Sequence, residues 1–258
     1  MQIKIALQPS PPSPAVWGLW ICSLLALLLI PASGTTAEPR QRLDADSPQF
    51  LQSVGRLLVP GRRIEDGRER HYRESCSATL LTPSEGMQAS LILTAWHCLE
   101  YHTDLTDDIV FIIESSSGQH LRRSAKALSS GGGMHADWSI MRLREPIPTD
   151  RVSTASLSRT AGDDIGSRVV MAGFSRDETL GDSGKVLTFH RDCQVLAQSD
   201  RDMATDCLAY RGASGGGVFS SDGGRLLGVI SRGDGRENSI FVPASRIAGT
   251  ARVRSLLR

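Results

Sequence analysis

Short runs of apolar and β-branched residues, broken by glycine, proline, aspartate or serine, recur along most of this chain. Such runs at near-regular spacing are typical of an antiparallel sandwich or barrel, and they do not alternate with the helical patterns of a parallel sheet. We therefore expect an all-β protein with strands at 54–59, 77–82, 91–96, 108–113, 120–128, 138–143, 167–174, 185–197, 205–210, 216–221, 225–231 and 239–245.

A proline-containing linker at 144–160 divides these runs into two groups of six. Two equal groups predict two six-stranded antiparallel β-barrels packed together, the first over 51–145 and the second, with the linker, over 146–258. Only the last fifteen residues have helical spacing, because their apolar side chains can share one side of a helix. The second barrel is therefore expected to end in a short C-terminal helix.

Residues 1–37 differ from the rest of the chain. Sixteen apolar or small residues run from Ala15 to Ile30 and precede the stretch PASGTTA. This run is shorter than the roughly 20 residues that span a bilayer, and it is typical of a secretory signal peptide. An uncleaved signal anchor is the alternative, and it would tether the same domain to a membrane. Residues 38–50 are polar and predict a flexible tail or a short propeptide.

Four cysteines follow the predicted signal peptide. An even number in an exported chain favours disulfides and a secreted or periplasmic location. Of the three possible connectivities, Cys76–Cys98 with Cys193–Cys207 closes the shortest loops. A zinc site that includes His97 is the alternative, but no pair of cysteines has the close spacing of common zinc ligands. We therefore expect no metal and no cofactor.

Charge excludes one class of partner. Basic and acidic residues nearly cancel, which leaves a formal net charge of +1. A chain without a strong field does not attract nucleic acid or an anionic membrane over a distance. We expect no nucleic-acid partner, and membrane contact only if the N-terminal segment stays uncleaved.

One histidine and one aspartate stand where they could exchange protons. His97 directly follows an apolar strand and precedes Cys98, and imidazole exchanges a proton near neutral pH. Asp137 directly precedes another predicted strand, where a partly buried carboxylate can accept a hydrogen bond from Nδ1 of a histidine. Asp107 and Asp108 also stand at a strand start and remain alternatives.

Two serines could act as a nucleophile, Ser183 in GDSG (181–184) and Ser214 in GASGGG (212–217). Attack on a carbonyl needs an exposed hydroxyl, a base within reach and backbone N–H groups that converge on the oxyanion. The GDSG stretch suits an ordinary turn between two strands equally well. The glycines around Ser214 let its backbone approach a substrate without obstruction, which favours Ser214.

Three motifs in order, TAWHC (94–98) with Cys76 upstream, DWSIMRL (137–143) and GASGGG (212–217), resemble those of the chymotrypsin-like (trypsin-fold) serine proteases, particularly their bacterial V8-like branch. The similarity spans roughly residues 54–244. It implies the double-barrel fold and a monomeric exported serine endopeptidase that acts on protein or peptide substrates.

The resemblance also implies a role for each motif residue. His97 would be the general base, Asp137 would orient it, and Ser214 would be the nucleophile of an acyl-enzyme mechanism. The backbone N–H groups of Gly212 and Ser214 would form the oxyanion hole, and Cys76 would be bonded to Cys98. Strand order supports Ser214, because three predicted strands follow it, as the family pattern expects.

Some positions depart from this family. Ala213 stands where the trypsin subgroup has an aspartate that pairs with a new N-terminus, so that activation switch cannot operate in its usual form. Leu208 falls where trypsin-like enzymes carry an acidic residue at the bottom of the primary pocket, which argues against specificity for lysine or arginine. SRGDG (231–235) is expected to hold the substrate backbone through Ser231 and Gly233.

Two alternatives have the same motifs. A catalytically inactive homologue would keep the double barrel as a binding module. The histidine, aspartate and serine of the motifs are all present at sensible spacing, which argues against loss of the catalytic residues. An esterase would use the same three residues on another acyl substrate.

Overall fold

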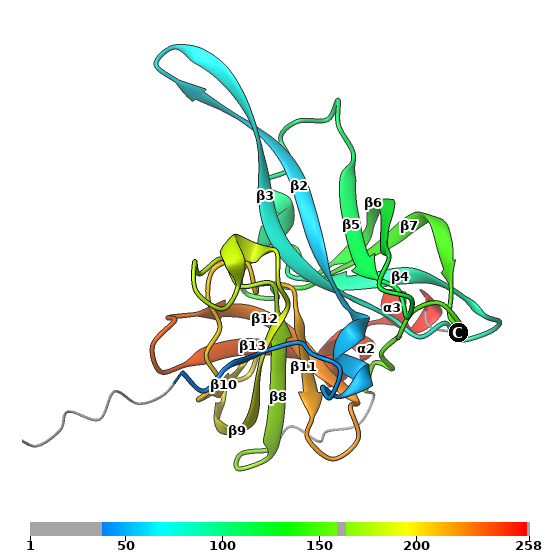
Figure 1. Ribbon diagram of the computed structural model, residues 1–258, viewed down its shortest axis with the longest axis vertical. Helices are drawn as coiled ribbons and strands as arrows, with labels where there is room; N and C mark the ends of the chain where they lie inside the picture. The colour runs from blue at the N-terminus through cyan, green and yellow to red at the C-terminus, as the bar shows by residue number, and fades with distance from the viewer. Residues whose placement is uncertain (1–37, 159–163, 257–258) are drawn as a thin grey trace, which may run out of the picture. The chain divides into compact units, whose positions relative to one another are not determined.

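The computed structural model describes residues 38–158 and 164–256. These residues form two closed six-stranded antiparallel β-barrels, as the sequence predicted (Figure 1). The predicted signal peptide lies outside the described residues, so it stays a prediction.

The first barrel has the strand order β2-β3-β4-β7-β6-β5, and pairing of β5 with β2 closes it. Alternate residues of its strands point inward, and the core they fill includes Leu57, Ile92, Phe111 and Met141. The helix α1 (His97–Glu100) follows β4 directly. The strands are β2 (Val54–Glu65), β3 (Arg68–Leu80), β4 (Gln88–Thr94), β5 (Ile109–Glu114), β6 (His120–Ser130) and β7 (Ser139–Pro148).

The second barrel has the order β9-β10-β13-β12-β11-β8, and pairing of β8 with β9 closes it. A core that includes Leu93 and Ile140 of the first barrel and Phe219 and Val229 of the second joins the two. The strands are β8 (Arg168–Gly173), β9 (Thr188–Gln198), β10 (Met203–Thr205), β11 (Gly217–Ser220), β12 (Leu226–Gly233) and β13 (Ser239–Pro243).

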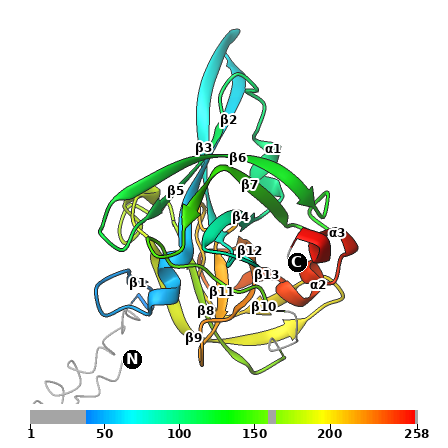
Figure 2. The same ribbon diagram turned by 90° about the vertical axis from the view of Figure 1, so that its right-hand side faces the viewer.

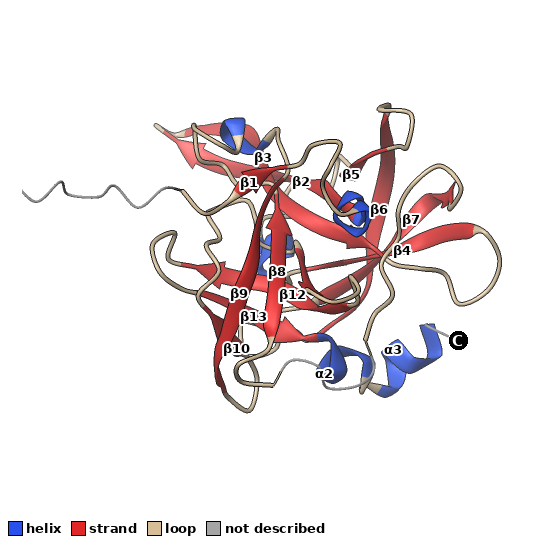
Figure 3. Ribbon diagram, turned by 60° about the horizontal axis from the view of Figure 1, so that its bottom comes forward, coloured by secondary structure: helices blue, strands red, loops and turns tan. Residues whose placement is uncertain are grey.

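The predicted C-terminal helix is present as two short helices, α2 (Ala244–Ala248) and α3 (Ala251–Leu256), which follow β13 (Figure 3). Val253 of α3 is fully buried in the core that joins the barrels. Among the described helices, none is long and apolar enough to cross a membrane.

Strands β2 and β3 continue well past the apolar runs that predicted them and form a hairpin that extends beyond the barrel (Figures 1 and 2). Its outer part is polar, so hydrophobic periodicity could not reveal it. The hairpin turns at Asp66 and Gly67, which both have positive φ, and a two-residue Asp-Gly turn matches the twist of paired strands. Ile64 near the tip is 80% exposed.

Residues 38–50 differ from the flexible tail that their polarity predicts. The two-residue strand β1 (Gln41–Arg42) pairs with the start of β9, and the 3-10 helix η1 (Gln49–Ser53) buries Leu51. Backbone pairing and the buried side chain of Arg40, only 4% exposed, hold this segment to the second barrel in place of an apolar stripe. The expectation of a flexible tail is therefore wrong, whereas removal as a propeptide stays a prediction.

Candidate active site

His97 and Asp137 meet because their strands are neighbours. Strand β4 ends three residues before His97, Asp137 lies two residues before β7, and β4 pairs with β7 up to Thr94 and Ser139. The carboxylate of Asp137 accepts one bond from the backbone N–H of His97 at 2.9 Å and one from ring Nδ1 at 2.8 Å. Nδ1 therefore carries the hydrogen, and Nε2 is left as the basic nitrogen.

Asp137 is fully buried, and its hydrogen bonds keep it ionised. Burial raises the pKa of this carboxyl, but hydrogen bonds from His97 and from the hydroxyl of Ser231, at 2.5 Å, outweigh burial and lower it. The carboxylate is thus negative at neutral pH, where it stabilises a protonated imidazole. The sequence predicted Ser231 as a substrate contact and missed its bond to Asp137.

Ser214 lies on the loop between β10 and β11 and is partly exposed. Its hydroxyl donates to the carbonyl of Ser231 at 3.3 Å. The hydroxyl of Ser231 also donates a hydrogen bond to Asp137. Ser231 therefore links the predicted nucleophile to the carboxylate that is hydrogen-bonded to His97. The structure therefore brings all three predicted residues into one hydrogen-bond network that spans both barrels.

Two glycines give the Ser214 loop its path. Gly212 and Gly215 have φ of +95° and +84°, where other residues are strained. A Cβ on Gly215 would lie 2.1 Å from the carbonyl oxygen of Ser77, so no side chain fits there. The first barrel thus packs directly against the backbone beside Ser214, and the N–H of Ser77 donates to the Ser214 carbonyl at 2.8 Å.

Hydrogen bonds fix the backbone around the two predicted oxyanion donors. Among the described residues, no protein acceptor takes a hydrogen bond from the backbone N–H of Gly212 or of Ser214. The carbonyl of the same peptide is held in each case. The Arg211 carbonyl accepts from the N–H of Arg176 at 2.7 Å, and the Ala213 carbonyl accepts from the N–H of Gly216 at 2.9 Å. The Gly212 carbonyl, in the peptide between these two, accepts from the hydroxyl of Ser77 at 2.8 Å. Both peptide planes are fixed while their donors stay available.

A buried carboxylate from the first barrel reinforces this loop. Glu74 is 7% exposed and bonds the guanidinium groups of Arg176 at 3.1 Å and Arg211 at 3.0 Å. These are the residues whose backbones are hydrogen-bonded to each other. Nothing in the sequence pattern indicated Glu74 or Ser77, because their partners lie about a hundred or more residues away.

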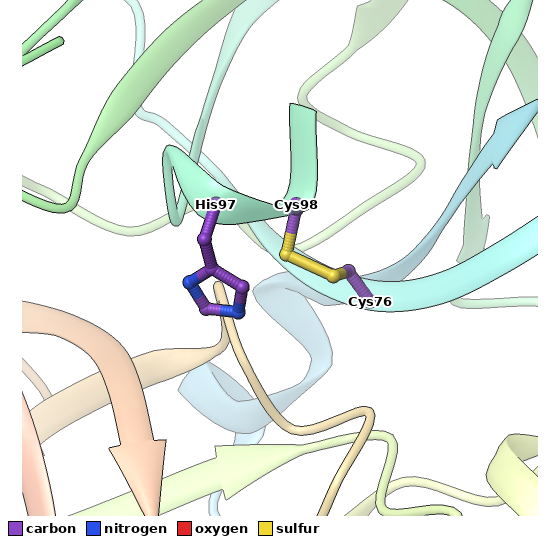
Figure 4. Close-up of side chains that lie close together, drawn as sticks. All are labelled: Cys76, His97 and Cys98. Carbon is purple, nitrogen blue, oxygen red and sulfur yellow. A yellow bond between two sulfur atoms is a disulfide. The ribbon is translucent and has the colours of Figure 1, made fainter. Parts of the chain in front are cut away.

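Both predicted disulfides are present, Cys76–Cys98 and Cys193–Cys207. Figure 4 shows the bridge from Cys98 on α1 to Cys76, directly beside the imidazole of His97. These three side chains lie close enough to surround a metal ion, but bonded sulfurs offer no thiolate. Zinc favours thiolate ligands, so the oxidised cysteines do not fit a zinc site at this position.

The remaining predicted contacts lie near the second disulfide and at the end of β12. The N–H of Leu208 donates to Nδ1 of His190 at 3.0 Å, and burial lowers the pKa of His190. Gly233 is exposed and pairs with Ser239 of β13. The neighbouring Arg232 is bonded to Asp202 at 2.9 Å, which compensates its charge.

Ser183, the alternative nucleophile, lies in the single-turn helix η2 (Asp182–Gly184) and is exposed. Its φ is +56°, and its N–H donates to the carbonyl of Asp177. The GDSG stretch is therefore a turn between β8 and β9.

Comparison with known proteins identifies a family. The family model described as Trypsin-like peptidase domain matches residues 76–229, a range that contains His97, Asp137 and Ser214. No curated protein shows significant similarity to the chain.

Proposed function

Because the chain belongs to the family of trypsin-like peptidase domains, we propose that it is a serine endopeptidase that cleaves peptide bonds through an acyl-enzyme on Ser214. The observation that carries this proposal is the network in which Asp137 holds His97 while Ser231 joins Asp137 to Ser214. It supplies a base, an orienting carboxylate and a hydroxyl from two separate barrels.

The chemistry begins at Nε2 of His97, because Nδ1 is already bonded to Asp137. The hydroxyl of Ser214 turns from the Ser231 carbonyl toward Nε2 and gives up its proton as Oγ attacks the substrate carbonyl. The N–H groups of Gly212 and Ser214 bind the resulting oxyanion. The imidazolium then protonates the leaving amine, and water repeats the cycle to release the acid.

Asp137 keeps the imidazole in this tautomer throughout. Its buried charge also stabilises the imidazolium that forms when Ser214 attacks. The hydrogen bonds from the backbone N–H of His97 and from Ser231 hold the carboxylate in place, and the ring cannot rotate away without breaking its own bond from Nδ1 to this carboxylate.

We also propose export and a preference that excludes basic side chains. The two disulfides fit an oxidising compartment, and the apolar N-terminal run fits a secretory signal. Leu208 offers no charge to pair with lysine or arginine. Membership of the V8-like branch is part of the same proposal and rests on the motif resemblance alone.

The test measures casein hydrolysis and labelling by a fluorophosphonate, a probe that reacts with activated serines. We expect labelled parent protein, no labelling or turnover in Ser214→Ala, and near-complete loss in His97→Ala. Ser183→Ala is the matched control and should retain full activity. An unlabelled but folded parent, or hydrolysis that persists in Ser214→Ala, would refute the proposal.

Protease and esterase activities are separated by competition. Peptide and ester substrates of the same acyl group are offered together, and a peptidase should turn over both. A protein that hydrolyses only the ester contradicts the endopeptidase assignment while leaving the acyl-enzyme mechanism intact.

A further inference from the structure

Arg40 is an almost fully buried arginine in the segment before the first barrel, with a side chain only 2% exposed. Its guanidinium bonds both carboxylate oxygens of Glu38, at 2.8 and 2.9 Å, and one oxygen of Asp177 at 2.8 Å. The same group lies over the ring of Tyr210, 3.9 Å from its centre. Burying a charge is costly unless it is paired, and this charge is paired on each side.

Asp177 connects Arg40 to the loop that contains Asp177 itself. Its second carboxylate oxygen accepts hydrogen bonds from the hydroxyl of Thr179 and from the N–H groups of Leu180 and Gly181, at 2.8 to 3.1 Å. One aspartate thus closes the turn at 177–181 and ties it to Arg40. The pKa of Asp177 reflects this, because burial raises it but the bonds from Arg40 and Gly181 lower it well below the ordinary range.

The contacts of Arg40 flank one critical hydrogen bond. Asp177 follows Arg176, and Tyr210 precedes Arg211, and the N–H of Arg176 donates to the carbonyl of Arg211 at 2.7 Å. A single guanidinium therefore touches the neighbours of both partners in this bond.

That bond sets the direction of a proposed oxyanion donor. The carbonyl of Arg211 and the N–H of Gly212 belong to one planar trans peptide, so they point in opposite directions. When Arg176 holds the carbonyl on one side, the N–H of Gly212 faces the other side and stays free of protein acceptors among the described residues. Rotation of this peptide would withdraw the donor.

A second arginine of the same segment reinforces the arrangement. Arg42 donates to the carbonyls of Leu180 and Thr179 at 2.8 and 2.6 Å, and the segment pairs with β9 through β1. The whole 177–181 turn is therefore held from one side by residues 38–42.

We propose that Arg40 is a positioning residue for the oxyanion donor of Gly212, and that residues 38–42 are a permanent part of the active enzyme. Cutting the chain after Arg40 would then lower the activity, the reverse of propeptide removal. This inference rests on the proposed function, since it assigns Arg40 a role in the same site.

The test compares Arg40→Gln and Arg40→Lys with the parent in the otherwise intact chain. Arg63→Gln is the matched control, because Arg63 also pairs with a glutamate and lies over a tyrosine ring, 5.2 Å from the centre of Tyr72, but on the distant hairpin. The readouts are the second-order rate of fluorophosphonate labelling, kcat and KM on a peptide substrate, and the affinity for a peptide boronic acid, which forms a tetrahedral adduct.

We expect Arg40→Gln to lower kcat and the labelling rate at least about tenfold, toward the ~10²- to 10³-fold loss that follows removal of one oxyanion donor. Boronate affinity should fall in parallel, whereas KM should change less than about twofold, because a donor used only in the transition state does not bind ground-state substrate. Arg40→Lys should recover part of the rate, since it keeps the charge beside Asp177 but loses the fork geometry.

Asp177→Asn provides a second variant in case Arg40→Gln does not fold. It should show the same fall in kcat, because it removes the charge that Arg40 binds. Normal labelling and kcat in a folded Arg40 or Asp177 variant would overturn the inference, as would a rise in KM alone. A parent protein that the probe never labels would instead reject the proposed function.

Discussion

Replacing Ser77 by alanine tests how the first barrel supports the Ser214 loop. Ser77 is fully buried next to Cys76. Its hydroxyl donates to the carbonyl of Gly212 and accepts from the N–H of Phe174, both at 2.8 Å. Ser77→Ala removes one oxygen atom and leaves that carbonyl and that N–H without their partner.

The size of the effect follows from these two groups. A buried polar group left without a partner costs about 1–3 kcal/mol, so the two groups together should lower the free energy of unfolding by about 2–6 kcal/mol. In a domain of this length each kcal/mol corresponds to roughly 2–4 °C, which predicts a Tm lower by about 4–24 °C. Because the Gly212–Ala213 peptide, which lies between the two proposed oxyanion donors, loses a restraint, kcat should also fall, by less than the ~10²-fold cost of losing an oxyanion donor.

Ser75→Ala is the matched control. Its hydroxyl is also buried, two residues away on the same strand, and it has no hydrogen-bond partner among the described residues. Removing an unpaired polar group should leave stability unchanged or slightly raise it. Both variants are compared by urea unfolding, where a lower midpoint with an unchanged slope reports stability alone, and by fluorophosphonate labelling.

Equal stability and equal labelling in the two alanine variants would refute the reasoning. That result would mean that the hydroxyl of Ser77 contributes nothing to the Ser214 loop. A loss confined to stability, with normal labelling, would limit Ser77 to a structural role.

Three further outcomes are expected. Replacing Cys193 and Cys207 together by serine opens a loop with a sequence separation of 14 and should cost about 3 kcal/mol, measured by urea unfolding against the disulfide-bonded parent without reductant. Glu74→Gln removes the negative charge between two guanidinium groups and should lower the free energy of unfolding by about 1–3 kcal/mol. Calorimetry measures this as a lower Tm, and an unchanged Tm would mean that these bonds contribute nothing. Arg40 helps to lower the pKa of Asp177 in the folded protein. The ionised Asp177 therefore contributes to the free energy of unfolding above about pH 3.8, and this contribution is lost as the pH falls below that value. The stability of Asp177→Asn should therefore fall less steeply than that of the parent as the pH is lowered. Superimposable curves of stability against pH would contradict this.

Local patterns in the sequence single out the candidate residues. His97 and Asp137 stand out because each lies at the end or start of an apolar run, and Ser214 because of its glycines. Their assignment as catalytic residues stays a prediction until the serine variants are measured. Their approach depends on the pairing of β4 with β7, which no local pattern contains.

Residue spacing along this chain predicted eleven of the twelve barrel strands and the break between the barrels, because the alternation of apolar and polar residues shows which face of a strand is buried. The strand predicted at 205–210 is the exception, because β10 spans only Met203–Thr205. The disulfides followed from the separation of the cysteines. The outer part of the β2–β3 hairpin is polar, so it has no alternation of apolar and polar residues from which it could be predicted. Only the tertiary structure decided the contacts that build the candidate site. Arg40 meets Asp177 across 137 residues and Ser231 meets Asp137 across 94, and such pairs form because packing two closed barrels leaves buried charges and hydroxyls that must find partners.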